Sequence, residues 1–140
     1  MARSALIGLS MGLLAVSALA ADTSPSYKGL AVAVVGAERV SVYRDLTVKD
    51  QKKEDLLIVR LEVRWTAETR YILIEDGDLR VRDAGGRDHK CAFTFVQSTA
   101  GPGDEKAVIE IPFRVKKEAT IVSLELGKLL LPLKTAEEKQ

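Results

Sequence analysis

The chain contains 140 residues, of which 21 are basic, 20 are acidic, one is histidine and one is cysteine. This length favours a single domain, and the balanced charge argues against a nucleic-acid-binding protein, which usually carries an excess of basic residues. A single cysteine excludes a disulfide framework within the chain, and the 46% hydrophobic content argues against wholesale disorder. The composition therefore predicts one folded domain.

Residues 1–20 have the features of a secretory signal peptide. Arg3 is their only charged residue, an apolar stretch follows, and Ala18 and Ala20 precede a cleavage point before Ala21. A charged start, an apolar stretch and a small-x-small end are typical of export signals. The apolar stretch is shorter than the roughly 20 residues that span a bilayer, and an uncleaved N-terminal anchor is the alternative. We expect an exported protein, periplasmic or extracellular, with no stable membrane insertion after cleavage.

The remainder of the chain divides into three parts. Residues 21–29 are polar at their start and contain Pro25, which predicts a short linker. Residues 30–134 carry the apolar patterns of a folded domain, and residues 135–140 form a charged, flexible tail. Cleavage after residue 20 would remove both methionines of the chain.

The clearest predicted strand runs from Leu57 to Trp65. Apolar residues at alternate positions are Leu57, Val59, Leu61, Val63 and Trp65, and the charged residues between them are Arg60, Glu62 and Arg64. This period of two places one face of a strand in the core and the other in water. Its β-branched and aromatic content also favours a strand over a helix.

Other short segments show the same patterns in chain order. The predicted strands are Leu30–Val35 continued by Val40 and Val42, Tyr71–Ile74, Leu79–Val81, His89–Phe95, Ala107–Val115, Val122–Leu126 and Leu129–Leu133. The polar segment from Arg44 to Asp55 predicts a loop, and Asp83-Ala-Gly-Gly-Arg87 predicts a hairpin turn. A bulge or bend at Gly127-Lys128 explains why the apolar alternation changes phase there.

These segments predict an all-β domain of about seven to eight strands, without a helix after the signal peptide. A two-sheet antiparallel sandwich and a small barrel both have this pattern, and Trp65 at the end of a central strand suits a sandwich core. Pro112 lies within a strand pattern, so it is expected near a sheet edge or where its nitrogen faces away from the ladder. We predict an antiparallel, immunoglobulin-like β-sandwich.

Three local patterns carry a resemblance to a known family. They are the strand Leu79-Arg-Val-Arg-Asp83 followed by Gly85-Gly86, the turn Pro102-Gly103-Asp104-Glu105, and the strand Ile111-Pro112-Phe113-Arg-Val115. With the preceding strands Leu30–Val42 and Leu56–Thr66, the chain resembles the secreted immunoglobulin-like domains of the mycobacterial immunoprotective secreted antigen type. The resemblance covers Leu30 to Leu133, and it departs where Trp65-Thr66 replaces a frequent asparagine. It implies a sandwich fold and carries over no catalytic or cofactor-binding residue.

His89 and Cys91 are the weak candidates for a metal site. Two residues that are two positions apart in a strand point to the same side, and nitrogen and sulfur donors suit zinc or copper. No other histidine or cysteine offers a third donor of this kind, and the cleaved chain lacks methionine for copper. The alternative is a core role for Cys91, beside Phe93 and Phe95, and a structural role for His89. Catalysis would also depend on His89, but the chain contains no Gly-x-Ser-x-Gly motif.

Two sets of charged residues are the remaining candidate binding sites. The acidic segment Glu75-Asp-Gly-Asp78, with Asp83 and Asp88 nearby, lacks the spacing of a calcium loop and is better explained by turn chemistry. The outward arginines of the predicted strands could bind phosphate or anionic lipid, or could pair with carboxylates on neighbouring strands. These residues are Arg60, Arg64, Arg80 and Arg82, with Glu62, Glu110 and Glu125 as partners. We favour the paired, solvated charges.

Together these observations predict an exported, non-catalytic binding or interaction module with no cofactor. Its partner is an unknown protein or small molecule, and nucleic acid is not among the expected partners. The alternative is a periplasmic or secreted carrier of a small apolar ligand, motivated by Leu129-Leu130-Leu131, which is apolar on both faces of a strand. A metal-binding protein or a hydrolase is the third class.

Overall fold

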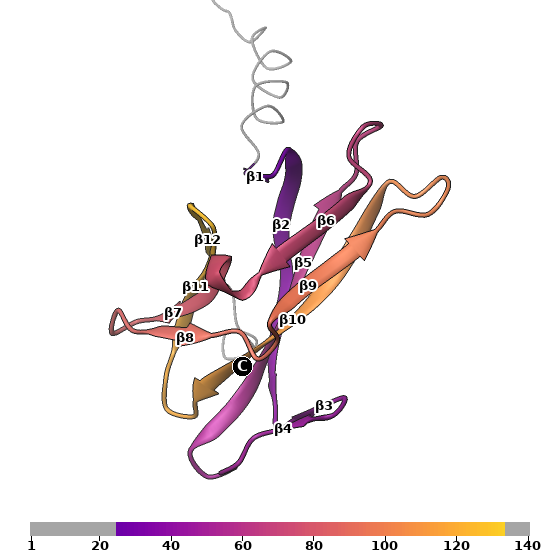
Figure 1. Ribbon diagram of the computed structural model, residues 1–140. Helices are drawn as coiled ribbons and strands as arrows, with labels where there is room; N and C mark the ends of the chain where they lie inside the picture. Colours follow the sequence, from indigo (N-terminus) through magenta and orange to yellow (C-terminus); the bar gives the residue numbers. More distant parts are fainter. Residues whose placement is uncertain (1–24, 134–140) are drawn as a thin grey trace, which may run out of the picture.

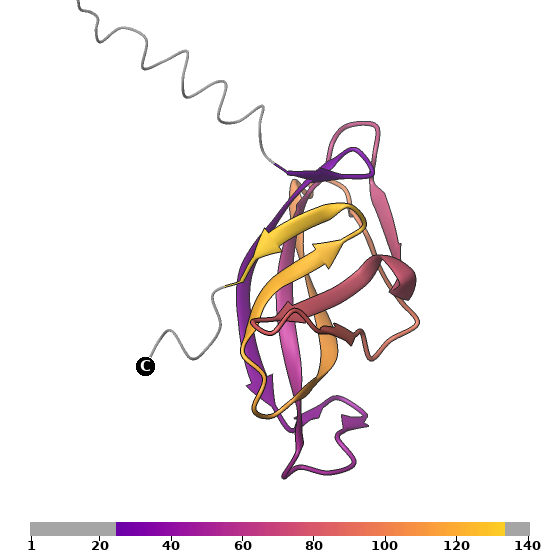
Figure 2. The same cartoon turned by 90° about the vertical axis from the view of Figure 1, so that its left-hand side faces the viewer.

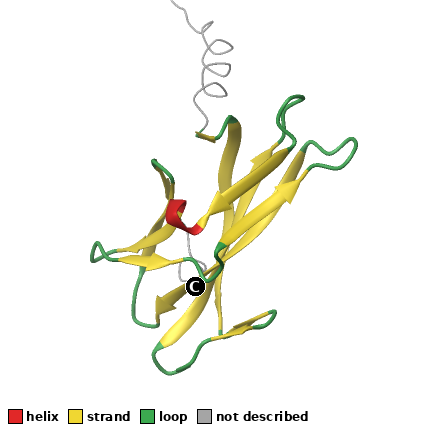
Figure 3. Cartoon of the chain, in the orientation of Figure 1, coloured by secondary structure: helices red, strands yellow, loops and turns green. Residues whose placement is uncertain are grey.

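A computed structural model describes residues 25–133 of the chain (Figure 1). The predicted signal peptide, residues 1–20, and the predicted tail, residues 135–140, lie outside the described residues. Between residues 25 and 133 the chain is all-β with antiparallel sheets, which confirms the predicted class, and its helical element is the 3-10 turn η1, Asp76–Asp78 (Figure 3). None of the helical structure in this range is long and apolar enough to span a membrane.

Two four-stranded antiparallel sheets form most of the fold. The first contains, in spatial order, β1 (Ser26–Tyr27), β2 (Leu30–Val40), β5 (Glu54–Arg64) and β10 (Lys106–Lys116). The second contains β12 (Leu129–Pro132), β11 (Ile121–Leu126), β7 (Leu79–Asp83) and β8 (Asp88–Lys90). Figure 2 shows β11 and β12 in front of β2 and β5, and one apolar core contains residues from both sheets. The arrangement is sandwich-like.

Two short antiparallel pairs complete the described chain. They are β3 (Val42–Tyr43) with β4 (Leu46–Thr47), and β6 (Tyr71–Glu75) with β9 (Phe95–Thr99). The structure between residues 25 and 133 therefore has twelve strand segments rather than seven or eight. The turn η1 separates β6 from β7, and bends at residues 92–94 separate β8 from β9.

The central strand β5 confirms the predicted alternation. All five predicted core residues, Leu57, Val59, Leu61, Val63 and Trp65, are buried. Leu56 and Ile58, on the opposite face, are also buried, because they form a second small apolar cluster with Val48. The predicted loop from Arg44 to Asp55 is thus only partly a loop: it contributes β4 and Val48 to a cover over this end of the sheet.

The N-terminal end of the domain also differs from the prediction. Residues 26–27, assigned to a linker by the sequence, form β1 and pair with β2. Tyr27 is buried in the main core, and its hydroxyl group donates a hydrogen bond to Asp78 at 2.6 Å. A single aromatic residue in a polar segment has no periodicity, so the sequence did not show this contact.

The phase change at Gly127 is a hairpin turn rather than a bulge within one strand. Leu126 of β11 pairs with Leu129 of β12, and Gly127 has a φ of +61°, which favours glycine at the first turn position. The bulge of this region lies earlier, at Val122, which is exposed while Ile121 and Leu124 are buried.

β12 does not support the apolar carrier. The run Leu129-Leu130-Leu131 motivated a strand covered on both faces, but β12 is at the edge of its sheet and Leu130 is 60% exposed. Leu131 packs in the core, so the run has one buried and one wet side. The run therefore belongs to a half-exposed edge strand.

The outward charges on both sheets are paired. Arg60 contacts Glu38 at 2.5 Å and Glu110 at 3.2 Å, and Arg82 contacts Glu125 at 2.7 Å. Arg64 lies 3.8 Å from Glu62, and Arg80 lies 3.9 Å from Asp88. All four predicted arginines thus have a carboxylate within 4 Å. Arg60, Arg80 and Arg82 pair across strands, as expected, whereas Arg64 pairs with Glu62 of its own strand.

Candidate functional site

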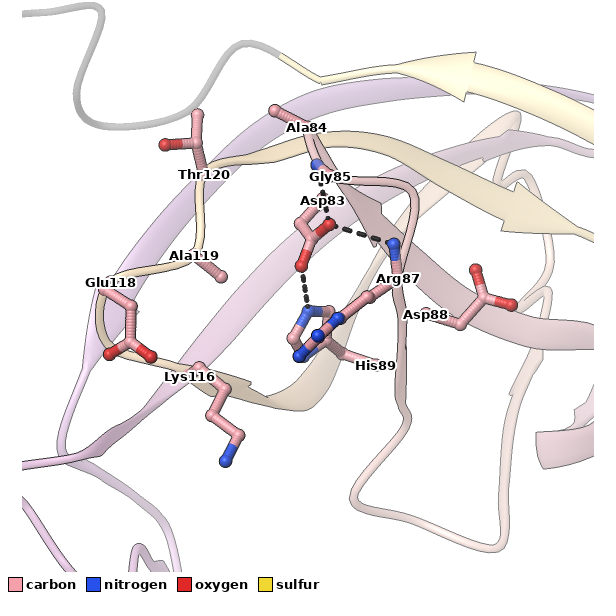
Figure 4. A pocket seen from close by; sticks show the side chains of 10 residues that line it. All are labelled: Asp83, Ala84, Gly85, Arg87, Asp88, His89, Lys116, Glu118, Ala119 and Thr120. Atoms are coloured by element: carbon pink, nitrogen blue, oxygen red, sulfur yellow. Dashed lines mark hydrogen bonds and ion pairs between the residues drawn. The ribbon is translucent and has the colours of Figure 1, made fainter.

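His89 lies on β8 and points to the hairpin that joins β7 to β8 (Figure 4). Its Nε2 atom lies 2.9 Å from Oδ2 of Asp83, the last residue of β7. The side chains of His89 and Asp83 are only 10% and 11% exposed. The predicted turn from Asp83 to Arg87 is confirmed, because β7 and β8 pair antiparallel on either side of it.

Asp83 also organises the turn itself. Its Oδ1 accepts hydrogen bonds from the backbone N–H groups of Gly85 and Arg87, both at 2.9 Å. The hydrogen bond with His89 and these N–H groups stabilise the carboxylate, and they lower the pKa of Asp83 below its ordinary value. The His89–Asp83 pair is therefore built into the hairpin by three contacts to one carboxylate.

A cavity of about 550 Å³ adjoins this pair. One wall is the β7–β8 hairpin, and the other is the turn between β10 and β11, with Lys116 and Thr120 (Figure 4). Arg39 holds that turn in place, because its guanidinium donates to the carbonyl oxygens of Lys116, Lys117 and Ala119. The cavity is lined by both acidic and basic side chains, so it does not present a charge of one sign to a ligand.

The candidate pair His89 and Cys91 does not form one site. His89 lines the hairpin cavity, whereas Cys91 lines a different cavity beside η1. The reason is that the chain changes sheets between them: His89 pairs with Val81 in the second sheet, but Cys91 bridges to Phe113 of the first sheet. The predicted continuous strand from His89 to Phe95 is therefore wrong.

Cys91 is partly buried at this crossing point. It packs against the main core, and the N–H of Phe93 donates to its sulfur at 3.4 Å. Burial raises the pKa of the Cys91 thiol above its ordinary value. Phe93 packs against the core as predicted, whereas Phe95, predicted beside it, is exposed.

The acidic residues near the hairpin are dispersed. Asp78 accepts the Tyr27 hydroxyl, Asp83 supports the hairpin turn, and Asp88 pairs with Arg82 at 3.1 Å. Within residues 25–133, no group of three or more histidine, cysteine or acidic side chains is placed to hold a metal ion.

A second region, which the sequence did not indicate, combines apolar exposure with an open groove. We call it the Phe95 surface, and it is formed by Tyr71, Leu73, Phe95, Gln97 and Val108. Phe95 is 48% exposed and Val108 is 51% exposed, although both are large apolar residues. The alternating residues Ile72, Ile74 and Val96 of the same strands are buried, so the opposite face of this pair packs on the core.

Two adjoining depressions shape the Phe95 surface. One, of about 360 Å³, lies on the outer face of β6 and β9 beside Tyr71 and Leu73. The other, of about 320 Å³, lies between β9 and β10 and is lined by Arg44, Val108 and Glu110. Phe95 and Gln97 line both depressions, so the two adjoin at these residues of β9. Exposed apolar surface rimmed by polar groups is typical of an interaction site.

Comparisons of the chain with protein-family models, with curated proteins and with solved structures gave no match. The resemblance to secreted immunoglobulin-like domains therefore stays a prediction.

Proposed function

We propose that the protein is an exported, non-catalytic binding module that recognises its partner through the Phe95 surface. The observation that carries this proposal is the half-exposed state of Phe95, which lines two adjoining depressions. Large apolar side chains left in water at one place cost solubility, and a partner that covers them would recover the apolar burial. The partner is a protein or a small molecule with an apolar contact face.

The strand order supports an immunoglobulin-like sandwich as the scaffold. If β6 with β7, and β8 with β9, each count as one interrupted strand, the long strands number seven. The first, second and fifth (β2, β5 and β10) lie in one sheet. The sixth and seventh (β11 and β12) lie in the second sheet with the β7 and β8 portions of the third and fourth, whose β6 and β9 portions form a separate pair. Constant-type immunoglobulin domains also place their first, second and fifth strands in one sheet and their third, sixth and seventh in the other. Their fourth strand joins the first sheet, whereas here its β8 portion lies in the second. Such scaffolds commonly present binding surfaces.

The hairpin contacts support a non-catalytic role. Asp83 uses one carboxylate oxygen for two backbone N–H groups and the other for His89, so the pair closes a turn. Among the described residues that line the cavity, Thr120 carries a hydroxyl group, and no hydrogen bond joins it to His89. Nucleophilic catalysis would require that contact or one like it.

Site-specific crosslinking tests the proposal. A benzophenone amino acid is placed at position 95 in one variant and, as a matched control, at position 122, an exposed apolar residue of the other sheet. We expect a defined crosslinked partner from position 95 and none from position 122 in the native compartment. Native mass spectrometry of the purified protein detects a small ligand in the same preparation. The proposal fails if position 95 yields no adduct and the native mass equals that of the chain alone.

A further inference from the structure

Glu75 of β6 and Phe95 of β9 lie directly opposite each other (Figure 1). The N–H of Asp76 donates to the carbonyl of Thr94, so the hydrogen-bonded pairs of this ladder are those of the even-numbered residues. Glu75 and Phe95 therefore form a non-hydrogen-bonded pair, the kind in which opposite side chains lie closest. Both side chains are exposed, so a carboxylate and an aromatic ring stand side by side in water.

The depression beside this pair has an apolar floor. Leu73 and Gln97 form the next outward pair along the ladder, and Tyr71 follows Leu73 on the same face of β6. Successive outward pairs are about 6.6 Å apart, because a strand rises about 3.3 Å per residue. All these residues line the depression of about 360 Å³, and most of its lining is apolar. It therefore suits an extended aliphatic chain that leads to the Phe95 ring.

Two carboxylates at one end of this depression lack a cationic partner. Glu75 and Asp76 both line it, and both are exposed. Among residues 25–133, neither carboxylate forms an ion pair with a lysine, arginine or histidine. Lys28 is nearby, but its ammonium donates to the carbonyl of Leu73 at 2.8 Å, at the outer edge of β6. None of the described residues that line the depression is basic, so this end of it attracts a positive charge.

Other outward glutamates of the two main sheets show what the β6–β9 pair lacks. Glu38 and Glu110 contact Arg60, and Glu125 contacts Arg82, in each case across neighbouring strands. The residue opposite Glu75 is an aromatic ring instead of an arginine from this chain. A positive charge for this carboxylate therefore has to come from another molecule.

A guanidinium group matches this combination of side chains. It is planar, so it can stack on an aromatic face while its N–H groups donate to a neighbouring carboxylate. The aliphatic stem of arginine packs on apolar surface while its charged end stays in a polar place. Lysine carries the same charge, but its compact ammonium has no flat face and forms no parallel pair of hydrogen bonds with a carboxylate.

We propose that the outer face of β6 and β9 binds an arginine side chain of a partner protein. The guanidinium stacks on Phe95 and donates to Glu75, and the aliphatic stem lies on Leu73. Asp76 adds a second negative charge at the same end. This inference rests on the proposed binding function and identifies the class of its partner, a protein that presents an exposed arginine.

A displayed library of random seven-residue peptides, selected on the purified protein, supplies the probes. We expect arginine at one fixed position of the enriched peptides. Synthetic copies then carry arginine, lysine or citrulline at that position, and citrulline keeps the shape of arginine without its charge. The citrulline copy should bind about tenfold more weakly, because the hydrogen bonds to a charged group and the stacking of a cation are both lost. The lysine copy should also bind more weakly than the arginine copy.

Variants of the protein locate the recognised charge. Glu75→Gln should weaken the arginine copy about tenfold and leave the citrulline copy unchanged, because both changes remove the same ion pair. Phe95→Leu keeps an apolar side chain without a ring face and should weaken the arginine copy about threefold. Glu118→Gln and Leu130→Ala, at exposed positions outside this face, are the matched controls and should not alter binding. Because Glu75 and Phe95 are exposed, both test variants should unfold at the denaturant midpoint of the parent.

The arginine inference is overturned if no peptide is enriched, if the enriched peptides lack arginine, or if Glu75→Gln weakens the arginine and citrulline copies equally. Its failure is distinct from failure of the proposed function. A partner crosslinked at position 95 whose capture is unchanged by Glu75→Gln would keep the binding module and reject arginine recognition. Absence of both the crosslink and a bound small molecule would reject the binding module itself.

Discussion

The Tyr27 hydroxyl donates a hydrogen bond to Asp78 across 2.6 Å, and this contact joins β1 of the first sheet to the 3-10 turn that precedes β7 of the second. Gly127 lies against the same ring, because a Cβ atom added there would lie 3.1 Å from Tyr27 Cε1. The N–H of Gly127 in turn donates to the carbonyl of Asp78 at 2.8 Å. Three chain segments thus meet at one end of the domain.

We expect Tyr27→Phe to lower the free energy of unfolding by about 1–3 kcal/mol, as loss of a hydrogen bond to a charged group does. Burial, followed by the hydrogen bond to Asp78, raises the pKa of Tyr27 above that of an unfolded tyrosine. The neutral tyrosine therefore stabilises the fold fully below about pH 10, and this contribution is lost as the pH rises further. Urea unfolding between pH 7 and 11 should show that loss in the parent protein and not in Tyr27→Phe.

Leu61 and Arg60 test the two faces of β5. Leu61 is fully buried, so Leu61→Ala should cost about 2–5 kcal/mol through lost burial and a residual cavity. Arg60 is half-exposed and pairs with Glu38 and Glu110, so Arg60→Ala should cost about 1 kcal/mol or less. Denaturant midpoints of the two variants give the comparison, and the reverse order would contradict the assignment of the faces.

Asp83 should make the stability of the folded protein depend on pH in the acidic range. Its pKa is lowered in the folded chain, so its stabilising contribution is present above the unfolded pKa of about 4 and is lost as the pH falls through the folded value. Asp83→Asn should be less stable than the parent at pH 7, and the difference should shrink toward pH 2. The matched control is Asp88→Asn, because Asp88 is a more exposed carboxylate of the same hairpin. Equal effects of the two substitutions at pH 7 would contradict the special role of Asp83.

Cys91 should react slowly with a thiol reagent in the folded protein. Burial limits access and raises the pKa of the thiol, while the thiolate is the reactive form. Labelling should accelerate in denaturant, and non-reducing gels should show a monomer. A folded-state rate equal to the unfolded rate would show that Cys91 is accessible, and Cys91→Ser serves as the unlabelled control.

If residues 1–20 are a cleaved signal peptide, the mature chain has a defined N-terminus. Intact-mass measurement of protein from the periplasm or medium should give a chain that starts near Ala21, because Ala18 and Ala20 precede the predicted cleavage point. A chain that retains Met1 and Arg3 in a membrane fraction would instead indicate an uncleaved anchor.

The sequence determined the fold class and the central strands, because a half-buried strand imposes its own period on the chain. The alternation from Leu57 to Trp65 and the two glycines before Arg87 placed β5 and the β7–β8 hairpin correctly. Pro112 was expected near an edge, and β10 is the last strand of its sheet. Each of these signals is local, since neighbouring residues alone carry it.

Only the tertiary structure decided which side chains meet. Tyr27 lies in a polar segment, and its partner is 51 residues away, so no local pattern contains the contact. The alternation from His89 to Phe95 looked continuous, but the chain changes sheets at Cys91, which separates the candidate metal ligands and turns Phe95 outward. Whether the chain crosses from one sheet to the other depends on how the two layers pack. The alternation of apolar residues is the same on both sides of such a crossing, so the sequence pattern does not reveal it.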